Sequence, residues 1–240
     1  MCGRFVAASP PAEIAAYFGA TLPETLLPSN YNVAPTTEVY AVVHGDDGPQ
    51  MQVFHWGLVP SWATERKIGS KMINARGETI SDKPVFSKLF SSRRCIIPAD
   101  GFFEWKSFPG LAGAKKPRKQ PYFIHRLDGE PLAMAGIWST WRDPTATAGE
   151  RLHSTSIVTT AANDTMLALH DRMPVILPVS AWSAWLDPLE RDLEWLKGLL
   201  VPAPNELLTF HPVSPEVNSV RNGGAELIVS TPEPTEGPAT

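Results

Sequence analysis

The sequence predicts a single β-rich α+β domain with several short helices. The 240-residue chain is 43% hydrophobic, which is enough to bury one substantial core. Its 24 prolines and 17 glycines divide it into short segments. The apolar runs between these breaks are short and rich in Val, Ile, Phe and Trp, which is typical of strands.

Nine apolar runs are expected to form strands and five segments to form helices. The expected strands are 39–43, 51–56, 95–97, 101–105, 122–125, 132–137, 156–160, 207–210 and 227–229. The expected helices are 11–18, with Ser9 as its N-cap, and 85–91, 164–169, 181–186 and 193–200. The domain is expected to span 2–229, with a flexible basic loop at 107–120 and a disordered tail at 230–240.

The charge of the chain is unevenly distributed. The net charge of −4 argues against a nucleic-acid partner, but residues 64–126 hold 14 of the 21 Lys and Arg against 5 acidic residues. That segment therefore carries +9 and the remainder −13. Such a concentration indicates either a phosphate-binding face or a solvated face. Near this segment, Trp62 is the aromatic residue expected to be exposed and to stack on bases.

The cysteines and the apolar runs exclude several classes. Cys2 and Cys95 form no pair or cluster with the spacing of a zinc site, so neither metal nor disulfide is expected. Cys95 lies in an apolar run and is expected to be a buried, inert thiol. The first residues carry no secretory signature and no run is long enough to span a membrane, so neither a leader nor a membrane span is expected. The expected location is the cytoplasm, or the nucleus in a eukaryotic source.

Cys2 carries the most informative chemistry. A small side chain at position two permits removal of the initiator methionine, which leaves a free α-amine beside a thiol. Their unperturbed pKa values, about 7.7–8.0 and about 8.5, leave nucleophilic fractions of both near neutral pH. An aldehyde condenses with the amine to a Schiff base, and the thiol then closes a thiazolidine ring. Taken alone, a cysteine at position two is more often a residue without special function.

Two segments supply candidate acid/base groups. Residues 74–78 place the amide of Asn74, the cation of Arg76 and a carboxylate close together, or else form a polar turn followed by a helix cap. Glu104 lies in an apolar and aromatic run. Ionised carboxylates are costly to bury without partners, so Glu104 is the candidate general acid/base. The alternative for Glu104 is a strand residue that alternates to solvent.

A third segment places a histidine after a short helix. Asn163 or Asp164 can cap this helix, which is expected to end near His170. The helix C-terminus and the neighbouring Asp171 both favour the imidazolium, so His170 can donate a proton. Arg172 can then hold a phosphate through a bidentate contact.

These segments together resemble the SRAP family, the SOS-response-associated peptidases or abasic-site processing proteins. The resemblance rests on the opening MCGR, NARGE at 74–78, IIPADGFFEW at 96–105, and TTAAND at 159–164 with HDRMP at 170–174. YNVAP, WGLVPSW, HPVS and GAELI extend it, so that it covers residues 2 to about 229. Two departures are mild: Phe103 replaces another aromatic, and the loop at 107–120 is longer than usual.

The resemblance implies an SRAP-type fold with a positively charged cleft that binds single-stranded DNA. Cys2 would form a thiazolidine crosslink with the aldehyde of an abasic site. Asn74 would orient the Cys2 end and the sugar, Glu104 would act as acid/base, and His170 would promote opening of the deoxyribose ring. The residues implied as DNA contacts are Arg4, Asn32, Pro35, Trp62, Arg76, Thr159 and Arg172.

The implied partners are single-stranded DNA with abasic sites and replication-fork proteins, and a monomer is expected. No cofactor is expected. The resemblance further implies an abasic-site (AP) lyase activity, crosslink reversal and an autopeptidase activity that exposes Cys2. Two other interpretations remain open. An N-terminal-nucleophile amidohydrolase explains Cys2 but not the basic segment. A noncatalytic single-strand binding module gives salt-dependent binding without a covalent product.

Overall fold

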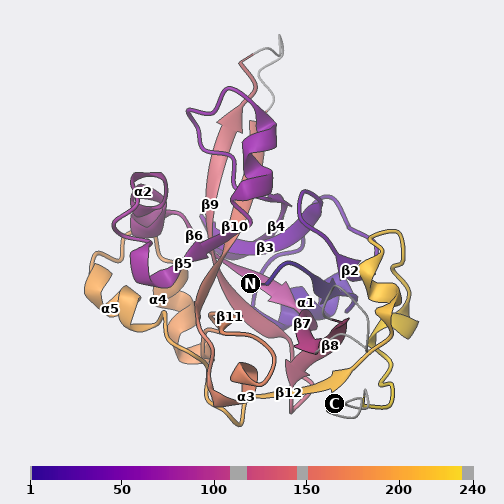
Figure 1. The fold of residues 1–240 in the computed structure, drawn as a ribbon. Coiled ribbons are helices and arrows are strands. Elements are labelled where there is room, and N and C mark those ends of the chain that lie inside the picture. The colour runs from indigo at the N-terminus through magenta and orange to yellow at the C-terminus, as the bar shows by residue number, and fades with distance from the viewer. Residues whose placement is uncertain (1, 109–117, 145–150, 234–240) are drawn as a thin grey trace.

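The computed structural model describes residues 2–108, 118–144 and 151–233, which form two β-sheets with short helices (Figure 1). The smaller sheet is antiparallel and has the order β12-β8-β7-β1-β2. Its strands are β1 (Phe5–Ala7), β2 (Asn30–Val33), β7 (Gly101–Phe108), β8 (Arg118–Arg126) and β12 (Leu208–Pro212).

The larger sheet contains a closed ring of strands. Its order is β11-β10-β4-β3-β6-β9, and β9 pairs in turn with β10, so five strands close into a barrel. β5 adds to β10 in parallel. The strands are β3 (Glu38–Gly45), β4 (Gly48–Trp56), β5 (Asn74–Arg76), β6 (Arg94–Ala99), β9 (Leu132–Arg142), β10 (Arg151–Ala161) and β11 (Arg172–Pro174).

The helices are short and lie on the outside of the sheets (Figure 1). The α-helices are α1 (Pro11–Tyr17), α2 (Pro84–Ser92), α3 (Asp164–Leu167), α4 (Trp182–Leu186) and α5 (Leu193–Gly198). The 3-10 helices are η1 (Arg66–Lys71), η2 (Gly77–Thr79), η3 (Val179–Ala181), η4 (Pro215–Asn218) and η5 (Ala225–Ile228).

Two main apolar clusters hold these elements together. One joins the two sheets and contains Phe5 and Phe102 of the smaller sheet with Phe54 and Ile97 of the larger one. The other packs the helices against the opposite faces of the barrel strands, as with Phe90 of α2. Alternate residues of one barrel strand therefore enter different clusters. The first cluster also contains Cys2, so the start of the chain is built into the core.

The predicted fold class, a β-rich α+β domain with short helices, is confirmed. Of the expected strands, only 227–229 is wrong, because Leu227 lies in the 3-10 helix η5 with its side chain buried. The expected Ser9 cap is also wrong. Pro10 occupies the N-cap position of α1, and Ser9 donates its hydroxyl hydrogen to Asp100 instead of accepting from the helix.

Strands occupy both ends of the segment predicted as a loop, and the start of the predicted tail contacts the domain. β7 continues to Phe108 and β8 begins at Arg118, so strand pairing covers both ends of the segment 107–120. The start of the tail contacts the domain, since the Thr231 amide donates to the Pro212 carbonyl at 2.9 Å. The Tyr122 hydroxyl donates to Glu233, also at 2.9 Å. Residues 109–117 and 234–240 lie outside the described residues.

Candidate active site around Cys2

Cys2 lies three residues before the start of β1, with its side chain completely buried in the cluster between the sheets. Trp56, Phe102 and Ile157 belong to the same cluster. Burial, followed by the charge of Glu104, raises the pKa of the Cys2 thiol well above its usual range. The thiol in this environment is therefore protonated at neutral pH.

Asn74 holds the backbone at Cys2. Its position is fixed by β5, in which Asn74 is in register with Ile157 of β10. The Asn74 Nδ2 donates to the Cys2 carbonyl at 2.8 Å. The Asn74 Oδ1 is buried and accepts no hydrogen bond from any described residue. An unsatisfied buried acceptor is costly, so this oxygen is suited to a donor that arrives during function.

Glu104 faces the same cluster as Cys2. Side chains alternate along β7, so Glu104 shares a face with Phe102, whereas Phe103 points into a different cluster. Only 4% of Glu104 is exposed, so the alternative of a solvent-facing strand residue is wrong. Its proximity to Cys2 is reflected in the raised thiol pKa. A carboxylate beside a buried thiol can exchange protons with groups at that position.

Arg172 is held by protein groups. Its Nη1 and Nη2 donate to the two Glu78 carboxylate oxygens at 2.5 and 2.9 Å, and Nη2 also donates to the Thr159 carbonyl at 2.8 Å. Hydrogen bonding from Arg172 lowers the pKa of Glu78. The bidentate edge predicted for a phosphate is thus occupied by a carboxylate. Arg76 is exposed and enters no ion pair among the described residues, so it is better placed for a phosphate.

The buried Asn32 holds the half-buried Arg4. The Arg4 Nη1 donates to the Asn32 Oδ1 at 2.7 Å and to the Val217 carbonyl at 2.8 Å. The Asn32 Nδ2 donates to carbonyls of the segment 217–222. Only 3% of Asn32 is exposed, which leaves it a positioning role in place of a direct DNA contact. Arg4 also lies 5.9 Å from the centre of the Trp105 ring.

His170 follows α3, which Asn163 caps by accepting from the Met166 amide at 2.9 Å. The His170 Nδ1 lies 2.8 Å from the Asp171 carboxylate and 3.0 Å from the Arg172 amide nitrogen. The Asp171 carboxylate and the Arg172 amide therefore both lie within hydrogen-bond distance of the same ring nitrogen.

Pro35 and Trp62 lie at turns near the ends of β2 and β4. Thr36, directly after Pro35, has a φ of 71°, and its amide donates to the Trp56 carbonyl at 2.8 Å. Trp62 is 65% exposed, as predicted, and lines a groove of about 310 Å³ with Lys67 and Lys71. Glu65 lines the same groove, so the groove combines an exposed aromatic ring with two cations and one carboxylate.

Cys95 is completely buried, as predicted, and burial raises the pKa of its thiol to about 12. The described residues contain no group of three His, Cys, Asp or Glu side chains placed to hold a metal ion. Within the same part of the chain, no helix has the length and apolar character needed to cross a membrane.

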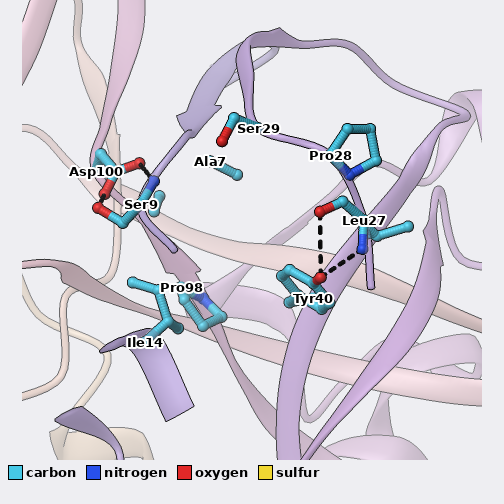
Figure 2. Close-up of a pocket in the computed structure, with 10 residues that line it drawn as sticks. Ala7, Ser9, Ile14, Leu27, Pro28, Ser29, Tyr40, Pro98 and Asp100 are labelled. Carbon is cyan, nitrogen blue, oxygen red and sulfur yellow. Dashed lines mark hydrogen bonds between the residues drawn. The ribbon is translucent and has the colours of Figure 1, made fainter. Parts of the chain in front are cut away.

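An apolar pocket elsewhere in the structure has polar groups that already bond to one another. Figure 2 shows Asp100 accepting from Ser9 and the Tyr40 hydroxyl bonded to Leu27. The cavity has about 20 Å³ of free volume, which is room for about one water molecule. This pocket is therefore part of the framework.

The fold and the site define a class of β-barrel-containing α+β proteins whose second residue is a core cysteine held by a strand asparagine. The chain belongs to the SOS response associated peptidase (SRAP) family, whose model matches residues 1–220.

Known relatives cover the whole domain. The chain is 39% identical over 232 residues to the abasic site processing protein YoqW of Bacillus subtilis, which covers 96% of this chain and 100% of the relative. It is 33% identical over 239 residues to YedK of Escherichia coli, another abasic site processing protein. This match covers 95% of this chain and 99% of the relative. The crystal structure of a protein from Bacteroides thetaiotaomicron matches with a TM-score of 0.82 at 27% identity. This match covers 96% of this chain and 100% of that protein's chain.

Proposed function

We propose that this protein processes abasic sites in single-stranded DNA by forming a thiazolidine crosslink through Cys2 after Met1 is removed. The observation that carries the proposal is the hydrogen bond from the Asn74 Nδ2 to the Cys2 carbonyl, together with the unused acceptor Oδ1 of the same side-chain amide. This arrangement fixes the backbone from which the freed α-amine would extend. The names of the YoqW and YedK relatives support the substrate.

The covalent steps need only the aldehyde and Cys2. The α-amine adds to the aldehyde carbon and loses water to give an imine. The thiol then adds to the imine carbon and its proton passes to the nitrogen, which closes the ring. Because burial and Glu104 raise the pKa of the thiol, the amine attacks first and the thiol second. A trapped imine no longer permits β-elimination, so the closed ring preserves the strand, and incomplete trapping gives weak lyase activity.

The remaining polar residues take supporting roles. Glu104 carries protons between the amine, the departing water and the thiol. His170 protonates the ring oxygen during opening of the deoxyribose. Arg76 and the Trp62 groove hold the flanking phosphates and bases. Arg172, Thr159 and Asn32 keep the surrounding strands and Arg4 in position.

The test incubates purified protein with a single-stranded oligonucleotide that contains one abasic site. Wild-type protein is expected to give a heat-stable shifted band, with the mass of the adduct formed on protein lacking Met1. Cys2→Ala and Cys2→Ser both keep the α-amine and lack the thiol, so neither should give a heat-stable band without reduction. Borohydride reduction of the imine should give a band with both variants. Cys95→Ala is the matched control, since it removes the other buried thiol, and it should crosslink as wild type does.

Two outcomes would overturn the proposal. Full crosslinking by Cys2→Ala would place the nucleophile elsewhere. Turnover of an amide substrate that DNA does not inhibit, without any DNA adduct, would favour an N-terminal-nucleophile amidohydrolase.

A further inference from the structure

The outer part of the β9–β10 hairpin carries a pair of like charges in direct register. Arg142 of β9 is opposite Arg151 of β10. Directly opposed side chains lie on the same face of the sheet, and like charges there are destabilising. Both arginines are exposed. A neighbouring anion would remove the repulsion between them.

A third arginine joins this face. Trp138 and Thr140 lie on the same face of β9 as Arg142, because side chains alternate along a strand. The Arg93 guanidinium lies 4.8 Å from the centre of the Trp138 ring, and its Nη1 donates to the Thr140 hydroxyl at 3.2 Å. These contacts hold Arg93 beside the strand pair.

His153 lies on the same face as these arginines. It is in register with Thr140 and packs against Trp138, with ring centres 5.7 Å apart. Burial, then Arg93, then Arg151 lower the pKa of His153. The two arginines thus create a positive potential at the same imidazole. None of the ion pairs between described residues involves Arg93, Arg142 or Arg151.

The opposite face of the hairpin is anchored. Trp141 packs in a small apolar cluster with Val59 and Ala63, and its Nε1 donates to the Ala63 carbonyl at 2.7 Å. The Val59 amide donates to the Ser154 hydroxyl at 2.8 Å. The hairpin projects from the barrel (Figure 1), and Arg142 and Arg151 are exposed on the face opposite Trp141.

We propose that Arg93, Arg142 and Arg151 form a second phosphate-binding surface, which takes the backbone of DNA that extends beyond the Cys2 site. The inference rests on the proposed function for its ligand. Arg151 is the first residue of β10, and Thr159 of the same strand is in register with Arg76 of β5. Eight residue steps at about 3.3 Å span roughly 26 Å, which is about eight nucleotides of stacked single strand. Only DNA longer than this engages both surfaces.

The test measures noncovalent binding of undamaged single-stranded DNA over a range of salt concentrations. The double variant R142A/R151A is expected to bind an oligonucleotide of roughly 30 nucleotides about tenfold more weakly. The slope of the logarithm of its affinity against the logarithm of the salt concentration should be shallower by about 1.4, since each lost phosphate contact to a single strand removes about 0.7. Binding of an oligonucleotide of about six nucleotides should not change.

Two further variants complete the design. Arg191→Ala removes an exposed arginine elsewhere and should bind both oligonucleotides as wild type does. Arg151→Glu converts the repulsive pair into an ion pair, so it should raise the melting temperature while weakening binding of the long oligonucleotide. If Arg151 affected only the stability of the hairpin, Arg151→Glu would not raise the melting temperature and weaken DNA binding at the same time. Wild-type affinity and salt slope in R142A/R151A would overturn the inference.

Failure of the proposed function is distinguishable from failure of this surface. Crosslinking of a short abasic oligonucleotide at saturating protein depends on Cys2 and should persist in R142A/R151A. If wild-type protein formed no crosslink but R142A/R151A still lost long-DNA binding, only the crosslinking proposal would fail.

Discussion

Thr36 holds a backbone conformation that its side chain disfavours. A φ of 71° lies in the left-handed region, which costs an L-residue about 1–2 kcal/mol and suits β-branched residues least. Paired backbone bonds keep the turn in place, from the Thr36 amide to Trp56 and from the Trp56 amide to Thr37. The strained turn fixes the direction in which Pro35 leaves β2, next to the end of β4.

Replacing Thr36 by asparagine should relieve this strain. Asparagine tolerates the left-handed region and keeps both backbone bonds, so the free energy of unfolding is expected to rise by about 0.5–1 kcal/mol. Urea denaturation measures the change. Thr36→Val, which remains β-branched, should give no increase. Equal stabilities of the asparagine and valine variants would contradict strain as the cause.

Single residues differed in how far the sequence could predict their roles. Cys2, Asn74 and Glu104 were predicted from their chemistry, and the structure brings them together. Arg172 was predicted as a free phosphate contact, but Glu78 occupies its guanidinium. In the sequence, Glu78 is two residues from Arg76. No sequence feature indicates that the partner of Glu78 is Arg172, which is 94 positions away. The pair forms because β11, which contains Arg172, and β5, which precedes Glu78, both pair with β10.

At the level of elements, Arg94 connects two helices to the barrel. It is buried in β6, where its Nε donates to the Trp185 carbonyl and its Nη1 to the Phe90 carbonyl, both at 2.7 Å. Its Nη2 donates to the Asp187 carbonyl. The Arg94 side chain thus donates to carbonyl groups that the C-terminal ends of α2 and α4 leave without a partner within the helix.

Arg94→Met tests this connection. Methionine fills much of the same space but leaves three carbonyls without their donor, so the free energy of unfolding should fall by at least about 3 kcal/mol. Chemical denaturation followed by tryptophan fluorescence measures the loss. Arg93→Met changes the neighbouring exposed arginine and should cost less than about 1 kcal/mol. Similar losses in both variants would show that Arg94 acts only through its apolar stem.

The strands that the sequence missed are short. β1, β2, β5 and β11 contain three or four residues each, too few for an alternating pattern to be recognised. Their strand character comes from distant partners, as when β5 pairs with Ile157–Thr159 of β10. Long strands such as β9 and β10 were predicted because their own residues carry the apolar pattern. Elements with internal signals were thus predictable, and elements defined by pairing were not.

Across the whole molecule, charge counted along the chain does not map onto one surface. The basic segment 64–126 includes Arg94, which is buried, and Arg126, which pairs with Asp128. Arg93 belongs to the same segment but clusters with Arg142 and Arg151, which lie outside it. The β9–β10 pairing assembles this cluster, so a count along the chain could not detect it.

The acid stability of the whole domain should depend on His55. Only 4% of His55 is exposed, and its Nδ1 lies 2.9 Å from the Arg66 Nη2. A guanidinium only donates, so Nδ1 must be unprotonated and the imidazole neutral. Burial, followed by the charge of Arg66, lowers the pKa of His55 from 6.5 to about 4. The unfolded chain therefore takes up this proton at a higher pH than the folded one.

The resulting stability is present above about pH 6.5 and is lost as pH falls from there to about 4, by up to about 1.4 kcal/mol per pH unit. His55→Asn keeps an acceptor for Arg66 but does not titrate, so its free energy of unfolding should decline less over this window. Denaturant unfolding at several pH values between about 7 and about 4.5 measures both proteins. His153, whose pKa is also lowered, remains in both and contributes equally. Parallel declines would show that protonation of His55 does not limit acid stability.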